Sequence, residues 1–205
     1  MSLHTLDHPL AHHVLARLRE KTTPPAEFRT LCHQIALLLL LEATRDLETQ
    51  NTVVNTPLET CTGRSLAQPL VAIPILRAGL GMLQPIVDLF PHVSVGYIGL
   101  ERDHATAQAR SYYCKLPKLE NTRILLLDPM LATGGSALQA LDVITESGGR
   151  DICLLNIVAS PEGVGVVSAA HPSIRIFTAS LDRGLDARKY ILPGLGDFGD
   201  RLYGT

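Results

Sequence analysis

Residues 122–144 read TRILLLDPMLATGGSALQALDVI and predict a buried strand, a short loop and a helix, in that order. The apolar run ends at Asp128, and residues 132–136 (ATGGS) lead directly into the helix. Glycines let main-chain amides approach an oxyanion, and a helix N-terminus offers unpaired N–H groups. The segment therefore predicts a phosphate-binding loop. The alternative is an ordinary strand-turn-helix connection with Ser136 as the helix N-cap.

No lysine follows these glycines, so the loop lacks the cation that a nucleoside-triphosphate-hydrolysing loop uses.

Strands and helices alternate along the rest of the chain. Continuous apolar runs predict strands at residues 70–76, 93–100, 122–128, 151–160 and 173–179. Helical spacing predicts helices at residues 26–47, 80–90, 136–147 and 161–170, with a short helix near the N-terminus. This alternation predicts an α/β fold with a Rossmann-like, mostly parallel sheet flanked by helices. Ligands of such sheets bind at the carboxyl ends of the strands.

The composition fits one domain with an aliphatic core. The 205 residues are 46% apolar, contain no Trp and include only nine Phe and Tyr residues, so Leu, Ile, Val and Ala must form the core. Basic and acidic residues nearly cancel, with 18 Lys+Arg against 20 Asp+Glu and a formal charge of −2. No global positive field attracts nucleic acid or an anionic membrane, so we expect neither as a partner. Any anionic ligand must be held locally.

The cysteines and the N-terminal segment indicate a cytoplasmic protein. The four cysteines form no CxxC pair, and we expect them to be reduced. The longest apolar run, at residues 35–41, has seven residues, which is too short to cross a membrane. His4, His8 and His12 would share one face if all three lay on a helix; we expect surface histidines there in preference to a metal site.

Two further segments predict contacts to a ligand. Arg77 follows the strand at 70–76 and precedes two glycines, so it could clamp a diphosphate; the alternative is a surface arginine before a helix. Residues 101–120 begin polar and then alternate, which predicts a hairpin flap above the sheet with Arg102 at its mouth. Residues 194–199 (GLGDFG) match a dinucleotide fingerprint, but only six residues follow, so we expect a glycine-rich binding loop and no dinucleotide site.

Together these segments resemble the uracil phosphoribosyltransferase family. The resemblance extends from HPL at residues 8–10 and EATRDL at 42–47 through PILRAGLGM, LLDPMLATGGS and ASPEG to YILPGLGDFGDRLYGT at 190–205. It implies transfer of ribose 5-phosphate from 5-phosphoribosyl 1-diphosphate to uracil, giving UMP and diphosphate with Mg²⁺ carried by the substrate. It also implies a single phosphoribosyltransferase domain over residues 1–205, with a base-binding hood at about 188–205.

The resemblance assigns site residues by position. Those that would bind 5-phosphoribosyl 1-diphosphate are Arg77, Arg102, Asp128, Pro129, Met130, Leu131, Ala132, Thr133, Gly134, Gly135, Ser136 and Asp197. Those that would line the uracil site are Ile191, Gly196, Asp197 and Phe198. No residue is assigned as a general base. The family further suggests a homodimer or higher homo-oligomer and, in some relatives, activation by GTP.

Three departures and two alternatives accompany this interpretation. Pro129 replaces the second of two adjacent acidic residues common in this fold, a departure that the uracil-specific family shares. Residues 102–106 read RDHAT in place of an RNEET-like flap start, and Phe198 stands where alanine is common; Phe198 either stacks near the base or packs the loop. The alternatives are a phosphoribosyltransferase for another base and a nucleotide-sensing, RNA-binding regulator.

Overall fold

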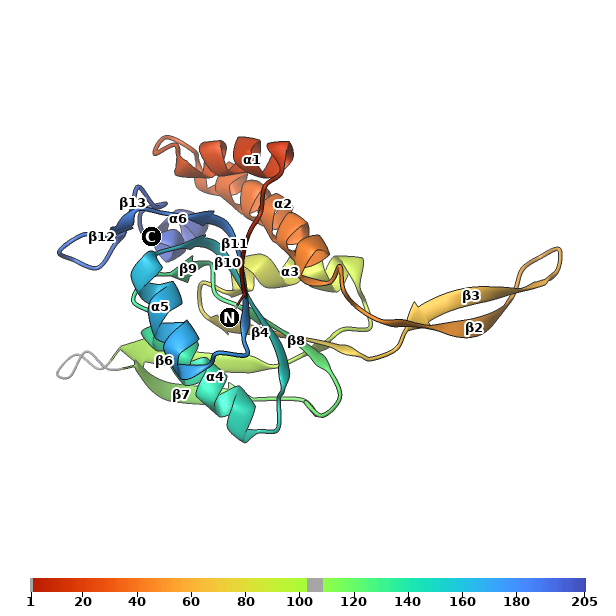
Figure 1. Ribbon diagram of the computed structural model, residues 1–205. Helices are drawn as coiled ribbons and strands as arrows, with labels where there is room; N and C mark the ends of the chain where they lie inside the picture. The colour runs from red at the N-terminus through yellow and green to blue at the C-terminus, as the bar shows by residue number, and fades with distance from the viewer. Residues whose placement is uncertain (1, 103–108) are drawn as a thin grey trace.

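A nine-stranded sheet forms the centre of the computed structural model, which describes residues 2–102 and 109–205 (Figure 1). The strands follow the order β1-β11-β10-β8-β4-β6-β7, with β5 beside β4 and β9 beside β10. All of these pairs are parallel except β6 and β7. The sheet strands are β1 (Ser2–Thr5), β4 (Leu70–Leu76), β5 (Ser94–Val95), β6 (Tyr97–Arg102), β7 (Ala109–Lys115), β8 (Arg123–Leu127), β9 (Met130–Leu131), β10 (Asp151–Ala159) and β11 (Arg175–Leu181).

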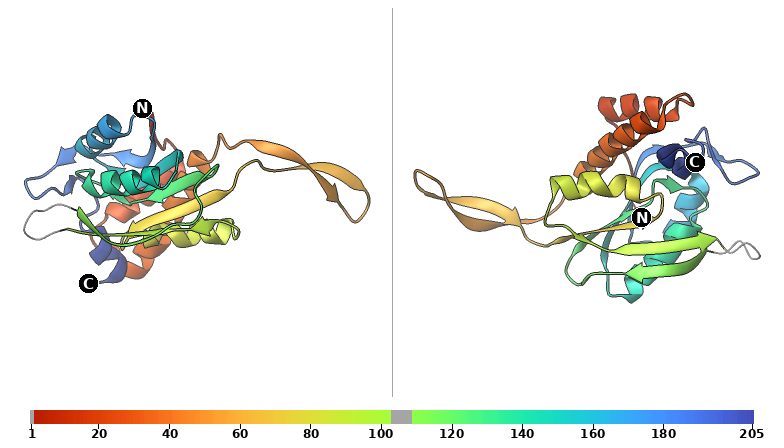
Figure 2. Two further views of the ribbon diagram at one scale, coloured as in Figure 1. Left: turned by 90° about the horizontal axis from the view of Figure 1, so that it is seen from below. Right: turned by 180° about the vertical axis from the view of Figure 1, so that it is seen from behind.

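Helices cover both faces of this sheet, as the alternating pattern predicts (Figures 1 and 2). The helices are α1 (Pro9–Arg19), α2 (Pro25–Ala43), α3 (Leu80–Leu89), α4 (Gly135–Glu146), α5 (Pro161–Ala170) and α6 (Phe198–Tyr203). Because side chains alternate along a strand, Leu125 and Leu127 of β8 pack in the core with α1, α2 and α3. Ile124 and Leu126 pack in the other core with α4 and α5. No helix of residues 2–102 and 109–205 is both long and apolar enough to cross a membrane.

The strand expected at residues 93–100 is divided in two at Gly96. The carbonyl of Ala72 in β4 accepts a hydrogen bond from the Gly96 amide. Two residues later in β4, Pro74 faces the same neighbour but has no N–H to donate. Pairing then resumes between Ile75 and Ile98. Pro74 therefore makes β4 irregular on this side and explains the separation of β5 from β6.

A long hairpin, which the sequence patterns do not predict, extends away from the body (Figure 1). It consists of β2 (Thr49–Asn55) and β3 (Thr60–Leu66), paired antiparallel, and we call it the arm. Most of its residues are exposed. Alternation of apolar and polar residues arises where a strand buries one face, so an exposed hairpin carries no such pattern.

The N-terminal histidines are exposed, as expected, but they do not share a helix face. His4 lies in β1 and stacks on Phe177 at a ring-centroid distance of 4.7 Å. His8 is the N-cap of α1 and accepts a hydrogen bond from the Leu10 amide, while His12 lies inside that helix. Pro9 begins α1, so the helical spacing cannot extend back to His4.

Fixed charges occupy the amino ends of the central strands. Arg123 at the start of β8 donates to Asp46 and, over 2.6 Å, to Asp151 at the start of β10. Arg175 at the start of β11 donates to the same two carboxylates. The side chain of Arg123 is 6% exposed, so these hydrogen-bonded partners offset the cost of its desolvation.

Candidate active site

The phosphate loop lies at the carboxyl end of β8, as predicted. After Asp128 the chain pairs briefly with β10 through β9, and α4 then begins at Gly135. Gly134 is the helix N-cap with φ of +82°, a conformation that favours glycine. No side chain caps α4, so the alternative that makes Ser136 an N-cap is wrong. The amides of the first turn of α4 have no side-chain cap, as an anion-binding helix end requires.

The part of this loop before Ala132 is hydrogen-bonded to β10 and to Ser160, which follows it. The Pro129 carbonyl accepts from the Ile157 and Val158 amides, and the Leu131 carbonyl accepts from the Ser160 amide. Pro129 and Leu131 are buried. These two residues, expected at the ligand, therefore fasten the loop to β10, while the residues from Ala132 to Ser136 form the part nearest to solvent.

The first turn of α5 supports the loop from the other side. Ser160 donates from Oγ to the Ala132 carbonyl over 2.6 Å and accepts from the Gly163 amide over 3.0 Å. A Cβ on Gly163 would lie 2.5 Å from the Ala132 carbonyl oxygen, and one on Gly134 would lie 3.0 Å from the Gly163 carbonyl oxygen. The two main chains are therefore in direct contact, and glycine is required at both positions.

A second turn packs beside the phosphate loop. Gly79 follows Arg77 at the end of β4, and a Cβ there would lie 2.5 Å from the Leu127 carbonyl oxygen. The close approach places the turn at Arg77 next to the end of β8. Arg77 itself is exposed.

The C-terminal segment contributes a small hairpin and a short helix. Strands β12 (Gly184–Leu185) and β13 (Ile191–Leu192) pair antiparallel. Asp197 caps α6 through a hydrogen bond of 3.0 Å from the Asp200 amide to its Oδ1. Phe198 is buried and meets Phe28 of α2 edge-on at 5.3 Å between ring centroids. Phe198 therefore packs the loop against α2, whereas its expected place near the base stays a prediction.

A cavity of about 480 Å³ joins the phosphate loop to this C-terminal segment. Its lining residues are Ala78, Met130, Ala132, Ser136, Arg188, Lys189, Tyr190, Ile191, Gly196, Asp197, Phe198 and Gly199. Seven of the fifteen site residues assigned from the sequence are in this set. Arg77, Asp128 and Gly135 lie on the adjoining turns but outside the lining. Arg102 ends β6, and its side chain lies outside the part of the chain that the structure describes.

Sequence reasoning assigned no role to Arg188 or Lys189. Asp186 Oδ1 accepts from the Arg188 and Tyr190 amides and so shapes the turn between β12 and β13. Lys189 has φ of +69° in this turn. Two consecutive basic residues directly before the YILPGLGD segment are a signal that could have indicated an anion-binding wall.

Burial makes the Asp128 carboxyl group a weaker acid than an ordinary aspartate. Desolvation raises its pKa to about 7, against a small opposing effect from the hydrogen bond of the Met130 amide. A hydroxyl-bearing or cationic ligand beside this carboxylate would restore the ionised form. The side chain of Asn156 donates to the Asp128 carbonyl and helps to fix the end of β8.

Comparison with known proteins gives the family. The sequence profile of the family described as uracil phosphoribosyltransferase matches residues 5–205. A uracil phosphoribosyltransferase of Thermosipho africanus is 50% identical, with all of both chains covered, and one of Symbiobacterium thermophilum is 52% identical over 98% of this chain and 97% of its own. This chain belongs to the uracil phosphoribosyltransferase family.

The fold of this family member is shared by a solved structure of the AQ2163 protein from Aquifex aeolicus. The TM-score is 0.95 at 33% identity, over 99% of this chain and 98% of the other. Within this phosphoribosyltransferase fold, β6 and β7 form the antiparallel pair expected at the flap. The RDHAT segment is residues 102–106, and all of it except Arg102 lies outside the described residues, so its contacts stay a prediction.

The raised pKa of Asp128 predicts that the stability of the protein depends on pH. Its pKa in the folded, ligand-free protein is about 7, against 3.8 for an ordinary aspartate. Between these values the folded state holds a proton that the unfolded chain has released, so the free energy of unfolding falls as pH rises from about 4 to 7. Asp128→Asn cannot release this proton, so it removes this pH-dependent fall in the free energy of unfolding. Urea unfolding should therefore show the variant gaining stability relative to wild type between pH 4 and pH 8.

The exposed carboxylate of Asp88 on α3 offers the control for this measurement. Asp88→Asn should track wild type across the same pH range. Parallel curves for Asp128→Asn and wild type would contradict the raised pKa.

Proposed function

We propose that this protein transfers the 5-phosphoribosyl group from 5-phosphoribosyl 1-diphosphate to uracil, giving UMP and diphosphate. The observation that carries the proposal is the shared cavity: Ala132 and Ser136 of the phosphate loop line one side, and Ile191 and Gly196 line the other. A sugar phosphate held at the loop would point its anomeric carbon at a base held by the C-terminal segment. Family membership over the whole chain supports the same reaction.

The chemistry requires positioning and charge stabilisation. Displacement at the anomeric carbon develops positive charge on the ribose ring and negative charge on the leaving diphosphate. The amides from Gly134 to Ser136 would hold the 5-phosphate, and Asp128 would accept from the ribose hydroxyls. Arg77 and Arg102 would stabilise the diphosphate. Closure of the β6–β7 flap would exclude water that could otherwise hydrolyse the donor.

The main chain of β13 suits the edge of uracil. The carbonyls of Tyr190 and Leu192 accept hydrogen bonds from the Asp186 and Arg183 amides, which flank β12, so the N–H and C=O of Ile191 face away from β12 by strand alternation. Uracil presents an acceptor, a donor and an acceptor along one edge, which matches N–H, C=O and N–H groups of a main chain. Cytosine would place an amine against a donor and leave it unpaired, a penalty large enough to discriminate.

Mg²⁺ would enter with the donor substrate and neutralise its diphosphate. The hard cation prefers oxygen ligands; Asp197 lines the cavity, and Asp128 lies on an adjoining turn. Among residues 2–102 and 109–205, no three His, Cys, Asp or Glu side chains gather into a metal-binding group. The substrate would therefore supply most of the ligands of the ion.

A base-selectivity assay tests the function. The protein is incubated with 5-phosphoribosyl 1-diphosphate, Mg²⁺ and one of uracil, cytosine, hypoxanthine or adenine, and nucleotide formation is followed. We expect UMP from uracil and at least about 100-fold slower product formation with cytosine, the size of one unpaired buried donor. A product from another base with none from uracil would support the other-base alternative. No nucleotide at any enzyme level would refute transferase activity.

Gly135→Ala separates anion binding from folding. A Cβ on Gly135 would have no neighbour closer than 3.8 Å, so the fold accommodates alanine, which also favours a helix. The added methyl group would occupy the place of a phosphate oxygen. We expect the KM for the donor to rise by about tenfold or more, equivalent to roughly 1.4 kcal/mol, while the melting temperature is kept.

Gly165 on α5 provides a matched control, because a Cβ there meets nothing within 4 Å. Gly165→Ala should leave the donor KM unchanged and should keep or raise the melting temperature, because alanine favours a helix. An unchanged donor KM in Gly135→Ala would remove the phosphate loop from the proposed mechanism.

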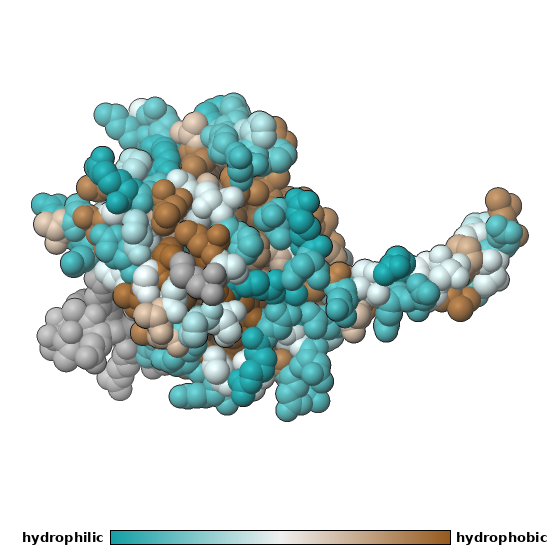
Figure 3. Space-filling model, viewed as in Figure 1, coloured by the Kyte–Doolittle hydropathy of each residue, from teal (hydrophilic) through white to brown (hydrophobic). Residues whose placement is uncertain are grey.

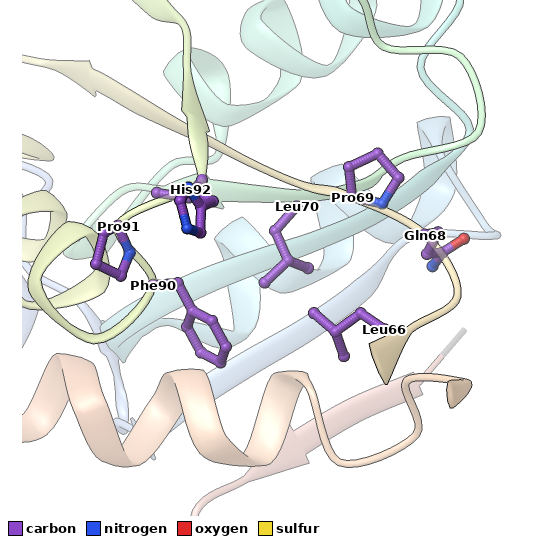
Figure 4. A pocket seen from close by; sticks show the side chains of 8 residues that line it. Leu66, Gln68, Pro69, Leu70, Phe90, Pro91 and His92 are labelled. Carbon is purple, nitrogen blue, oxygen red and sulfur yellow. The ribbon is translucent and has the colours of Figure 1, made fainter. Parts of the chain in front are cut away.

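The protein also forms a homo-oligomer in this proposal, with the arm as the contact. An isolated two-stranded hairpin is marginally stable in water, yet the arm exposes apolar residues, with Leu58 95% and Val53 76% exposed (Figure 3). An apolar cavity of about 260 Å³ lies at the root of the arm, where Leu66, Leu70 and Phe90 converge (Figure 4). Two arms placed antiparallel about a twofold axis would put each tip near the root of the other.

Leu58→Asp tests this contact. The charge at the tip should shift the mass in analytical ultracentrifugation toward that of one chain, whereas Leu10→Asp, at a 60% exposed leucine of α1, should leave the mass unchanged. Equal masses for wild type and Leu58→Asp would contradict association through the arm tip.

Two other expectations stay predictions. Activation by GTP is tested by adding GTP to the UMP assay. A cytoplasmic location is supported by the four cysteines, all free and all within the described ranges, as a reducing compartment requires.

A further inference from the structure

A buried ion pair lies behind the C-terminal wall of the cavity. Arg19, the last residue of α1, donates from two nitrogens to the two oxygens of Asp182, over 2.6 and 2.8 Å. The side chain of Asp182 is 2% exposed and that of Arg19 is 23% exposed. Neither residue lines the cavity. The pair joins segments that are 163 positions apart in the sequence.

This pair holds both main-chain groups of Gly194. The Gly194 amide donates to Asp182 Oδ2 over 2.8 Å, and its carbonyl accepts from Arg19 over 2.8 Å. Gly194 has φ of +61°, and a Cβ there would lie 2.1 Å from the Ile191 carbonyl oxygen. The orientation of the turn between Ile191 and Gly196 therefore depends on a charged pair that belongs to α1 and to the end of β11.

All partners of the Asp182 carboxylate are donors. Oδ1 accepts from Arg19 and from the Ser180 hydroxyl, and Oδ2 accepts from Arg19 and Gly194. Desolvation by burial opposes ionisation of this group, but the hydrogen bonds from Arg19, Ser180 and Gly194 outweigh it and hold the pKa of Asp182 below its usual value. An amide in its place would direct an NH₂ group at donors on one side, so Asp182→Asn should disturb the turn although its shape is almost the same.

The end of α1 is itself held against the C-terminal segment. Arg201 of α6 donates to the carbonyls of Leu18 and Glu20, over 2.5 and 2.6 Å, and to that of Leu195 over 2.8 Å. The guanidinium also lies over the Phe28 ring, 4.4 Å from its centroid. These contacts fix the position of Arg19 relative to the turn that it supports.

We propose that Arg19 and Asp182 are positioning residues for the base site: they orient the Gly194 turn, and through it the main-chain edge of Ile191 to Gly196 that recognises uracil. The inference rests on the proposed function. It distinguishes the base site, which depends on α1, from the donor site, which depends on β8, α4 and α5. Loss of the pair should therefore affect uracil and spare 5-phosphoribosyl 1-diphosphate.

Steady-state kinetics of Asp182→Asn test the proposal, with UMP formation by wild type as the prerequisite. Failure of that prerequisite would refute the proposed function and not the positioning role. We expect the KM for uracil to rise by about 10- to 100-fold, as for loss of a charged hydrogen bond, while the KM for the donor stays within about twofold. Arg19→Lys, which keeps the charge but cannot bridge Asp182 and Gly194 in the same way, should give a smaller shift in the same direction.

Two controls separate positioning from stability. Ser180→Ala removes one hydrogen bond of Asp182 and one of Arg19 but keeps both bonds to Gly194, so its uracil KM should rise less than that of Asp182→Asn. Asp46→Asn breaks an ion pair at the opposite edge of the sheet and should lower the melting temperature without a selective change in the uracil KM. An unchanged uracil KM in both Asp182→Asn and Arg19→Lys, or a parallel rise in both KM values, would overturn the proposal.

Discussion

The main chain of the phosphate loop lies directly against the main chain of the first turn of α5, and the Ser160 hydroxyl bridges the two segments. Gly163 and Gly134 make this approach feasible, since a Cβ at either position would meet a carbonyl oxygen of the other segment at 2.5 to 3.0 Å. Because α5 follows β10 and the loop follows β8, and these strands are neighbours in the sheet, the contact transfers the geometry of the sheet to the loop. The loop is thereby held in place by the core of the protein.

The sheet and this loop were predictable because each depends on local sequence. Strands β4, β8 and β10 are continuous apolar runs, as expected of strands covered on both faces, and the Gly134–Gly135 pair follows one of them directly. Sequence alone did not show that the carbonyls of Pro129 and Leu131 would fasten the loop to β10. That attachment depends on which carbonyls β10 occupies, and it is determined by pairing between segments about 28 residues apart.

The parts that the sequence does not predict lack a buried face, are too short to show a pattern, or depend on partners that are distant in the sequence. The arm buries neither face, so β2 and β3 show no alternation. Strands β12 and β13 have two residues each, too few for any period. In the sequence, Arg19 and Asp182 are two ordinary charged residues 163 positions apart, and only the fold brings them into contact. A long-range contact of this kind leaves no pattern in the spacing of residues, although in our proposal it orients the turn that forms the base site.

The two edges of the sheet use charge in opposite ways. At the amino edge, two arginines and two aspartates, Arg123, Arg175, Asp46 and Asp151, neutralise one another within the protein. At the carboxyl edge, Arg77, Arg188 and Lys189 form no direct ion pair with any carboxylate among the described residues. Near-neutral net charge is thus compatible with a strongly local positive site. In the proposed function a diphosphate or a phosphate would supply negative charge there, so the ligand would complete at one edge the balance that aspartates provide at the other.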